Sequence, residues 1–193
     1  AAKAKRTVDL GVKALKWDPF GSSHMTISRE QLHKSVDIIG AVREAVGENI
    51  DLLIECHGRF NPTTAIEISR EIEQFKPMFF EEPVPPDNLD ALKEVKDKSP
   101  VAISAGERLY TRWDYRPMFD KMAADYIQPD ISHAGGIMEL KKIAAEAESR
   151  YIPFAPHNPS GPVANAATLQ LAACCPNFCI LEIMYSDVEW RKD

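Results

Sequence analysis

Ionisable residues recur along this 193-residue chain at a nearly constant interval, each after a short apolar run. Successive members are separated by 26, 26, 23, 27 and 25 residues. A single carboxylate after a strand is usually a helix cap or a solvated loop residue, but six in register are improbable by chance. We therefore interpret the series as one constellation, made of Glu55, Glu81, Glu107, Asp130, His157 and Glu182.

Several carboxylates that point into one cavity repel each other, and each raises the pKa of the next unless a cation joins them. Oxygen-only ligands suit a hard divalent ion that keeps some of its waters, which favours Mg²⁺ over Zn²⁺. No HExxH or paired CxxC motif competes for a metal. Such a site leaves coordination positions open for a carboxylate with an adjacent hydroxyl.

Asp130 and His157 follow successive apolar runs and form a candidate coupled pair. A carboxylate that is hydrogen-bonded to one imidazole nitrogen fixes the tautomer and raises the basicity of the other nitrogen. His157 is then a candidate general base. The chemistry that suits it is removal of the proton α to a carboxylate, which gives an enediolate that a metal and a cationic or donor group stabilise.

The elements that must position these residues are short apolar runs alternating with amphipathic stretches, which indicates βαβ units and a parallel sheet. Helix starts are marked by Ser28 with Gln31, by Pro62, Asp87 and Thr111, and by Gly136 and Gly161. The expected strands are residues 12–17, 50–56, 78–81, 101–105, 126–128, 151–155 and 178–182.

A doubly wound sheet and a (β/α) barrel both fit this alternation. In a barrel all strand carboxyl ends meet at one mouth, so six residues face one another, whereas an open sheet brings only two or three together. We therefore predict a TIM-type (β/α)7β barrel over residues 1–193, containing strands 2 to 8. Residues 1–9 read as the end of a helix with Gly11 at its C-cap, and the first strand is expected to precede Ala1.

Composition excludes several classes of function. The net charge of −6 gives no basic excess for nucleic acid, and no apolar run reaches the roughly 18 residues that a membrane helix needs. The four cysteines form no CxxC and are expected to be reduced, which favours a cytoplasmic location. No glycine-rich nucleotide-binding motif occurs.

The sequence resembles the enolase superfamily, specifically the galactonate dehydratase-like branch of its mandelate racemase subgroup. The resemblance extends from Lys16 to Glu182 and is carried by ECHGR at residues 55–59, FEEP at 80–83, GER at 106–108, QPDxxHAGG at 128–136 and APH at 155–157. A Lys or His base with Mg²⁺ stabilising an enediolate is the general mechanism of the superfamily.

The resemblance implies roles for individual residues. Glu55, Glu81 and Glu107 match the three Mg²⁺ ligands, and His157 with Asp130 matches the general-base dyad. Glu182 matches the acid that hydrogen-bonds the substrate carboxylate. His57 matches the general acid that protonates the leaving 3-hydroxyl, and Lys16 matches the first lysine of a Lys-x-Lys motif. Beside these motifs lie candidate substrate contacts, namely Arg59, Arg108, His133 and Tyr110.

Two positions depart from the family pattern. Glu55 replaces the usual Asp ligand and is one methylene longer, so the metal or the backbone must shift. Asp18 replaces the second lysine. A racemase needs a base on each face of the α-carbon, so Asp18 favours the single base and general acid of a dehydratase. The family's α+β capping domain, which selects the substrate, is expected to lie outside this chain.

The predicted function is therefore that of a Mg²⁺-dependent hydro-lyase acting on a small-molecule sugar acid of the aldonate type and producing a 2-keto-3-deoxy acid. A cycloisomerase or epimerase acting on a related acid or lactone shares the enediolate, but its product has unchanged mass. A third hypothesis is a non-catalytic barrel that binds metal or sugar acid. The resemblance also implies a homo-oligomer.

Overall fold

The computed structural model describes residues 1–184. The chain divides into two compact units, Ala1–Ser104 and a second unit that begins at Ala105. The boundary falls inside one short strand, Ile103–Ala105, and each unit contains strand–helix repeats of its own. The two units are described separately below.

The first unit is built on parallel strands in sequential order, β1 (Ala14–Trp17), β2 (Asp51–Glu55), β3 (Phe79–Glu81) and β4 (Ile103–Ala105). Ile54, Phe80 and Ile103 form one buried row of register partners across the sheet. The next row contains Glu55 and Glu81, which are also buried. Because successive side chains of a strand point to opposite faces, the apolar row and the carboxylate row lie on opposite faces of the sheet.

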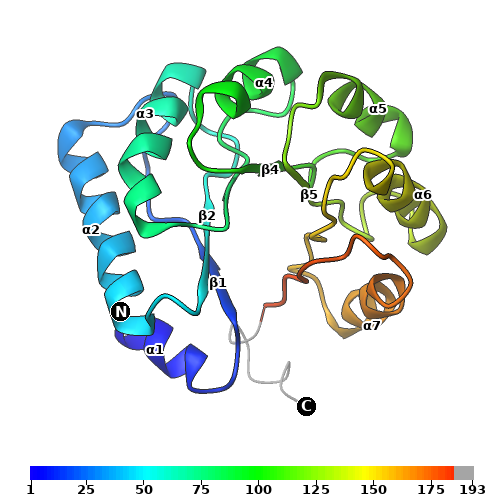
Figure 1. The fold of residues 1–193 in the computed structure, drawn as a ribbon, viewed down its shortest axis with the longest axis horizontal. Coiled ribbons are helices and arrows are strands. Elements are labelled where there is room, and N and C mark those ends of the chain that lie inside the picture. Colours follow the sequence, from blue (N-terminus) through cyan, green and yellow to red (C-terminus); the bar gives the residue numbers. More distant parts are fainter. Residues whose placement is uncertain (185–193) are drawn as a thin grey trace. The chain divides into compact units, whose positions relative to one another are not determined.

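The helices of the first unit are α1 (Ala2–Val8), α2 (Arg29–Val46), α3 (Pro62–Ile72) and α4 (Leu89–Lys98), with a short 3₁₀ turn, η1 (Glu73–Phe75). In Figure 1, α2 runs beside β1 and β2. The expected cap of α2 is confirmed, since the Ser28 side chain accepts a hydrogen bond from the Gln31 N–H. The head of α4 differs by one residue, because Asn88 rather than Asp87 accepts the first backbone N–H groups.

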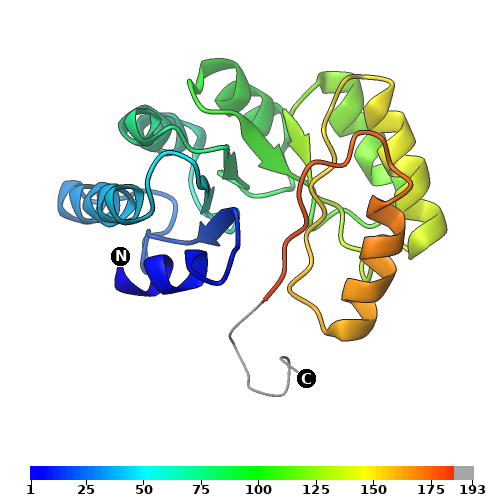
Figure 2. The same ribbon diagram turned by 60° about the horizontal axis from the view of Figure 1, so that its bottom comes forward.

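The second unit carries β5 (Tyr126–Ile127) and the helices α5 (Arg112–Lys121), α6 (Ile137–Glu148) and α7 (Pro162–Ala172). The Gln128 N–H donates to the Ala105 carbonyl at 3.0 Å, and parallel bridges join Ile127 to Phe154 and Phe154 to Phe178. Helices α6 and α7 lie side by side in both views (Figures 1 and 2). The expected start of α5 at Thr111 is confirmed, and Thr111 and Asp114 form a capping box there.

Two of the expected strands are not formed as ladders. Residues 151–155 and 178–182 contribute only the single bridges at Phe154 and Phe178, and Tyr151 lies in a turn with a φ of 61°. Pro153 and Pro156 explain part of this, since a proline has no N–H to donate to a ladder. The C-cap of α1 is Asp9 rather than Gly11, although Gly11 has the expected positive φ of 97° just beyond it.

The parallel α/β fold is therefore confirmed, whereas a closed barrel and a missing first strand stay predictions. Among residues 1–184, no helix combines the length and the apolar character that crossing a membrane requires.

Candidate functional site

Two buried carboxylates and a lysine meet at the carboxyl ends of the first unit's strands. The Lys16 Nζ lies 2.7 Å from Glu81 Oε1 and 3.5 Å from Glu55 Oε2. The Glu55 and Glu81 side chains are 5% and 0% exposed. Direct register pairing of these two residues on β2 and β3 explains why they share one face. The sequence prediction that strand ends gather these side chains is confirmed within this unit.

The donor set fits a hard cation. Glu55 and Glu81 each offer a carboxylate oxygen within 4.8 Å of the other, and both side chains are buried. Oxygen donors at this spacing suit Mg²⁺ better than softer metals. The longer Glu55 side chain is held in place, because its Oε1 accepts the backbone N–H of His57 at 2.6 Å. The extra methylene is thus accommodated without loss of a fixed carboxylate.

The first unit also contains a carboxylate–imidazole pair, formed by Asp18 and His57. Asp18 comes immediately after β1, and its Oδ2 lies 2.7 Å from the Nδ1 of His57, at hydrogen-bond distance. The Arg59 Nη2 lies 2.5 Å from the same Asp18 oxygen. The guanidinium of Arg59 also donates to the carbonyls of Cys56 and Gly21. Both strand ends therefore contribute to a charged network beside the two buried carboxylates.

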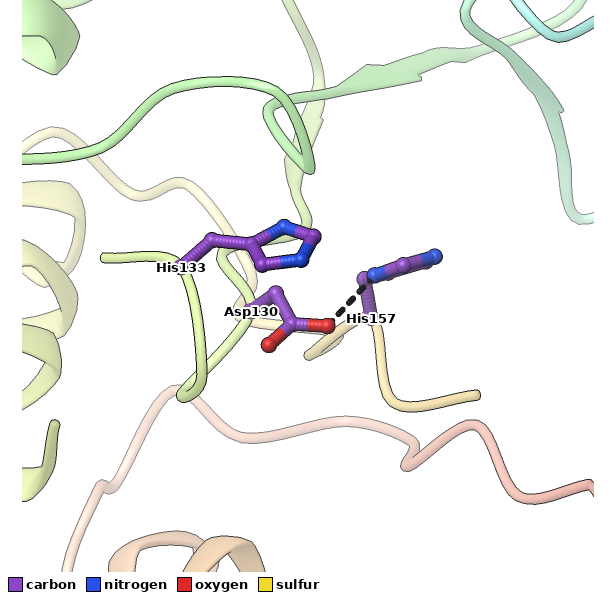
Figure 3. Close-up of side chains that lie close together, drawn as sticks. All are labelled: Asp130, His133 and His157. Atoms are coloured by element: carbon purple, nitrogen blue, oxygen red, sulfur yellow. Dashed lines mark hydrogen bonds and ion pairs between the residues drawn. The ribbon is translucent and has the colours of Figure 1, made fainter. Parts of the chain in front are cut away.

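In the second unit, Asp130 and His157 form the expected pair. Figure 3 shows the imidazole of His157 directed at Asp130, with Asp130 Oδ2 and His157 Nδ1 2.8 Å apart. The exposed fractions of the two side chains are 1% and 12%. When Asp130 accepts a hydrogen bond from the Nδ1–H of His157, the Nε2 is the basic nitrogen. This geometry is that of an oriented general base.

Asp130 stays ionised in spite of its burial. Burial alone raises its pKa, but the hydrogen bonds from His157 and from the Ser132 N–H outweigh that effect and hold the pKa below the usual value. The Ser132 N–H lies 2.6 Å from Asp130 Oδ1. One carboxylate oxygen is therefore fixed by the backbone and the other is directed at the imidazole.

Two further carboxylates of this unit lie near the Nε2 of His157. Glu107 Oε2 is 3.3 Å from it, and Glu182 Oε2 is 4.0 Å from it. The Asn158 N–H donates to Glu182 Oε2 at 3.2 Å, which orients that carboxylate. The predicted base, one predicted metal ligand and the predicted substrate-binding acid are therefore brought together within one unit.

The remaining candidates lie around this group. The Nδ1 of His133 is 3.2 Å from the Glu107 carbonyl oxygen, and its ring is 6.2 Å from that of His157 (Figure 3). Arg108 Nε is 3.7 Å from Glu107 Oε1. Tyr110 is 61% exposed, and its ring lies 6.5 Å from that of His133. Contact of these side chains with a substrate stays a prediction.

Asp130, His133 and His157 each offer one ligand atom, all within 4.8 Å of one another, so this set also has the composition of a metal site. Mixed nitrogen and oxygen donors suit Zn²⁺ or another transition metal. However, the 2.8 Å bond to Asp130 already engages the Nδ1 of His157. We therefore interpret the set as a hydrogen-bonded base with a neighbouring imidazole.

Sequence reasoning missed the positive role of Asp18, which it treated only as a departure from a lysine motif. A signal was present, since Lys16 and Asp18 are two residues apart and alternate residues of a strand share a face. It also missed Tyr115, whose buried hydroxyl donates to the Gly106 carbonyl at 2.6 Å. Nothing in the sequence pattern marks that contact, because the two residues belong to different elements.

Comparison with known proteins agrees with this geometry. The family described as Enolase C-terminal domain-like matches residues 1–193. D-gluconate dehydratase from Thermoproteus tenax is 38% identical over 100% of this chain and 39% of its own length. D-gluconate/D-galactonate dehydratase from Picrophilus torridus is 39% identical over 100% of this chain and 49% of its own.

Solved structures give the same result. A mandelate racemase/muconate lactonizing enzyme-like protein from Rubrobacter xylanophilus matches with a TM-score of 0.93 at 40% identity, over 98% of this chain and 50% of that one. The chain thus spans about half the length, or less, of these relatives. On the family match, the identities and the structural likeness, the chain belongs to the enolase superfamily, in its galactonate dehydratase-like branch.

Proposed function

We propose that this chain carries the catalytic residues of a Mg²⁺-dependent sugar-acid dehydratase. The observation that carries the proposal is the His157 imidazole, which is oriented by Asp130 at 2.8 Å and has its Nε2 3.3 Å from the Glu107 carboxylate. An oriented base beside a carboxylate of the predicted metal set suits proton abstraction next to a metal-bound acid. The dehydratase relatives described above support the choice of sugar acid.

We assign Glu55, Glu81 and Glu107 to one Mg²⁺, which when bound supplies positive charge next to the substrate carboxylate. The His157 Nε2 takes the α-proton, and the imidazolium that forms is stabilised by Asp130. Lys16 is assigned to the substrate carboxylate as a cation, and Glu182 is assigned to it as a hydrogen-bonding acid. The negative charge that develops on the substrate carboxylate oxygens is thereby stabilised.

The second half of the reaction removes the β-hydroxyl. His57 delivers a proton to the oxygen of this hydroxyl. The C–O bond breaks, its electron pair stays on the oxygen, and water leaves. The electrons of the enediolate form the new carbon–carbon double bond. The enol so produced tautomerises to a 2-keto-3-deoxy acid. Arg108 and His133 are assigned to the polyhydroxy part of the substrate. Homo-oligomeric assembly, which the family resemblance implies, and a cytoplasmic location, which the expected reduced cysteines favour, belong to the same proposal.

The test is a screen of the full-length protein against aldonates and aldarates with Mg²⁺, in which the 2-keto acid is detected as its semicarbazone. We expect turnover with at least one acid and a fall of about 10²–10⁴-fold in His157→Asn, because a positioned base contributes that much. A matched control is His33→Asn, which removes a histidine from α2 of the first unit. Undiminished dehydration in His157→Asn would contradict the proposal.

The same screen separates the alternatives. A product of unchanged mass, detected by NMR, indicates a cycloisomerase or epimerase, with the same base and a different second step. Binding of Mg²⁺ and acid without any product or α-proton exchange indicates a non-catalytic barrel. Asp18 at the second lysine position favours dehydration, because position 18 then has no lysine to act as a second base.

A further inference from the structure

The first unit contains a carboxylate–imidazole pair of which the proposed mechanism uses only the imidazole. Asp18 and His57 are 39 residues apart in sequence, and Asp18 Oδ2 lies 2.7 Å from His57 Nδ1. Strands β1 and β2 run parallel, so residues that follow their carboxyl ends meet at one edge of the sheet. The pair repeats, in chemistry, the arrangement of Asp130 with His157 in the second unit.

The Asp18 carboxylate is anchored on both oxygens. Its Oδ1 accepts the Phe20 N–H at 2.9 Å, and its Oδ2 accepts the Arg59 Nη2 at 2.5 Å. Arg59 is fixed in turn, since Nε donates to the Cys56 carbonyl at 2.9 Å and Nη1 donates to the Gly21 carbonyl at 2.7 Å. All three guanidinium nitrogens are therefore engaged by the protein.

The backbone holds His57 in an unusual conformation. Its φ is 54°, in the left-handed region that residues other than glycine seldom adopt, and Gly58 follows with a φ of 62°. Backbone strain of this kind persists at functional sites when the surroundings enforce it. Here the His57 N–H donates to Glu55 Oε1 at 2.6 Å and the Gly58 N–H donates to the Glu82 carbonyl at 2.7 Å.

The exposure of the three side chains also differs. His57 is 54% exposed, whereas Asp18 and Arg59 are 20% and 19% exposed. The imidazole is thus reachable, while the groups that hold it are mostly covered. The half-exposed imidazole therefore lies between a partly covered anchor and solvent.

We infer that Asp18, clamped by Arg59, is a positioning residue: it accepts a hydrogen bond from the Nδ1–H of His57 and thereby directs Nε2 at the substrate. The inference rests on the proposed function, in which His57 enters the acid step with a proton on each ring nitrogen. The Nε2 proton passes to the β-hydroxyl oxygen, and the neutral imidazole that remains keeps its proton on the Nδ1 that faces Asp18. Arg59 then acts through Asp18 instead of contacting the substrate. Groups that orient metal-ligating histidines typically contribute 10- to 100-fold to metal affinity or activity, and we expect an effect of the same order for the orientation of His57.

The test compares the two half-reactions of the full-length enzyme in Asp18→Asn. Exchange of the α-proton with D₂O, followed by NMR, depends on His157 and is expected to stay within about twofold of the unmodified enzyme. Loss of the β-hydroxyl is expected to fall about 10- to 100-fold. A substrate analogue with fluorine at C3 is expected to lose less rate, because fluoride leaves with less help from an acid. Equal loss in exchange and dehydration, or no loss in either, overturns the inference.

A double-mutant cycle asks whether Asp18 acts through His57. The double variant Asp18→Asn/His57→Asn is expected to dehydrate no more slowly than His57→Asn alone. A further fall of 10-fold or more in the double variant overturns the inference. Asp97→Asn is the matched control, since Asp97 also pairs with a cation, Lys93, but lies on the exposed surface of α4.

A measurement without substrate separates failure of this inference from failure of the proposed function. In protein labelled with ¹⁵N-histidine, the His57 signals are identified by their loss in His57→Asn. We expect a protonated Nδ1 in the unmodified protein and a shift toward the Nε2-protonated tautomer in Asp18→Asn. An unchanged tautomer overturns the positioning role even if the enzyme is a dehydratase. The expected shift supports that role even if no sugar acid turns over.

Discussion

Asp130 combines two properties that are rarely found together, since its side chain is 1% exposed and its pKa lies below the usual value. Burial acts to raise the pKa, and the hydrogen bonds from His157 and the Ser132 N–H reverse that effect. A group whose pKa is depressed on folding adds stability at pH values above the pKa of the unfolded chain, which is about 3.9 for Asp. That stability is lost as the pH falls through the lower, folded pKa.

This gives a prediction for the acid limb of stability. Asp130→Asn is expected to lower the free energy of unfolding by about 1.5 to 3 kcal/mol near neutral pH, the range for a hydrogen bond to a charged group. The difference from the unmodified protein should stay constant above about pH 5 and shrink below about pH 4. Urea denaturation at a series of pH values measures it. Glu48→Gln, at an exposed position, is the control, and a difference that grows toward acid pH would sink the interpretation.

Single residues also show what could be predicted from sequence. The pairing of Asp130 with His157 followed from residue type and spacing, because both come at the ends of neighbouring strands. The pairing of Asp18 with His57 did not follow, since it depends on a left-handed backbone turn at His57. A sequence pattern carries no direct sign of that turn apart from the glycine that follows.

The connection between β4 and α5 positions Glu107 and depends on close packing. Gly106 has a φ of 129°, and a Cβ at this position would lie 2.7 Å from the hydroxyl oxygen of Tyr115. That hydroxyl is the group that donates to the Gly106 carbonyl. The loop has space for glycine only, and Glu107 is the next residue along the chain.

Gly106→Ala is therefore expected to lose stability through both backbone strain and a clash, by about 1 to 3 kcal/mol. It should also lose most of the dehydratase activity, because Glu107 must move with the loop. Thermal denaturation and the semicarbazide assay measure the two effects. Gly47→Ala is the matched control, since Gly47 has a φ of 79° but nothing within 4 Å of the added Cβ. It should lose stability alone, and equal activity loss in both variants would contradict the prediction.

Helices were easier to predict from sequence than strands. The caps at Ser28 and Thr111 are local features, and the structure confirms both. The strands depend on hydrogen-bond partners that are far away in sequence. Residues 151–155 have the apolar character of a strand, but Pro153 and the following Pro156 lack the N–H groups that a ladder needs, so only Phe154 is bridged.

For the whole molecule, the groups assigned to catalysis are distributed over both halves of the chain. The first unit supplies two of the proposed Mg²⁺ ligands and the Asp18–His57 pair, and the second supplies Glu107 and the base. The sequence predicted the alternation of strand and helix over the full length. Barrel closure stays a prediction. It depends on how many strands pair edge to edge, and the sequence pattern of each strand does not determine which strands pair.

Binding of Mg²⁺ should stabilise the full-length protein, because an ion that binds only the folded state adds RT ln(1 + [Mg²⁺]/Kd) to the free energy of unfolding. At a concentration 100 times Kd this equals about 2.7 kcal/mol. Thermal denaturation after EDTA treatment, with and without added Mg²⁺, measures the effect. Glu81→Gln should need a much higher Mg²⁺ concentration for the same shift, whereas Glu48→Gln should not. A Tm that does not respond to Mg²⁺ would contradict the assigned ligands.

The hydroxyl of Tyr115 has a consequence for surveys of sequence variation. It belongs to a helix, is buried, and contacts a loop carbonyl one residue before a proposed metal ligand. In a library scored separately for cellular abundance and for growth on a sugar acid, buried helix positions normally lower both scores together. Tyr115→Phe should lower the growth score and leave the abundance score unchanged. The phenylalanine ring preserves the packing, and only the hydrogen bond to the loop carbonyl is lost. Genetics would then recognise position 115 as functional from the difference between the two scores.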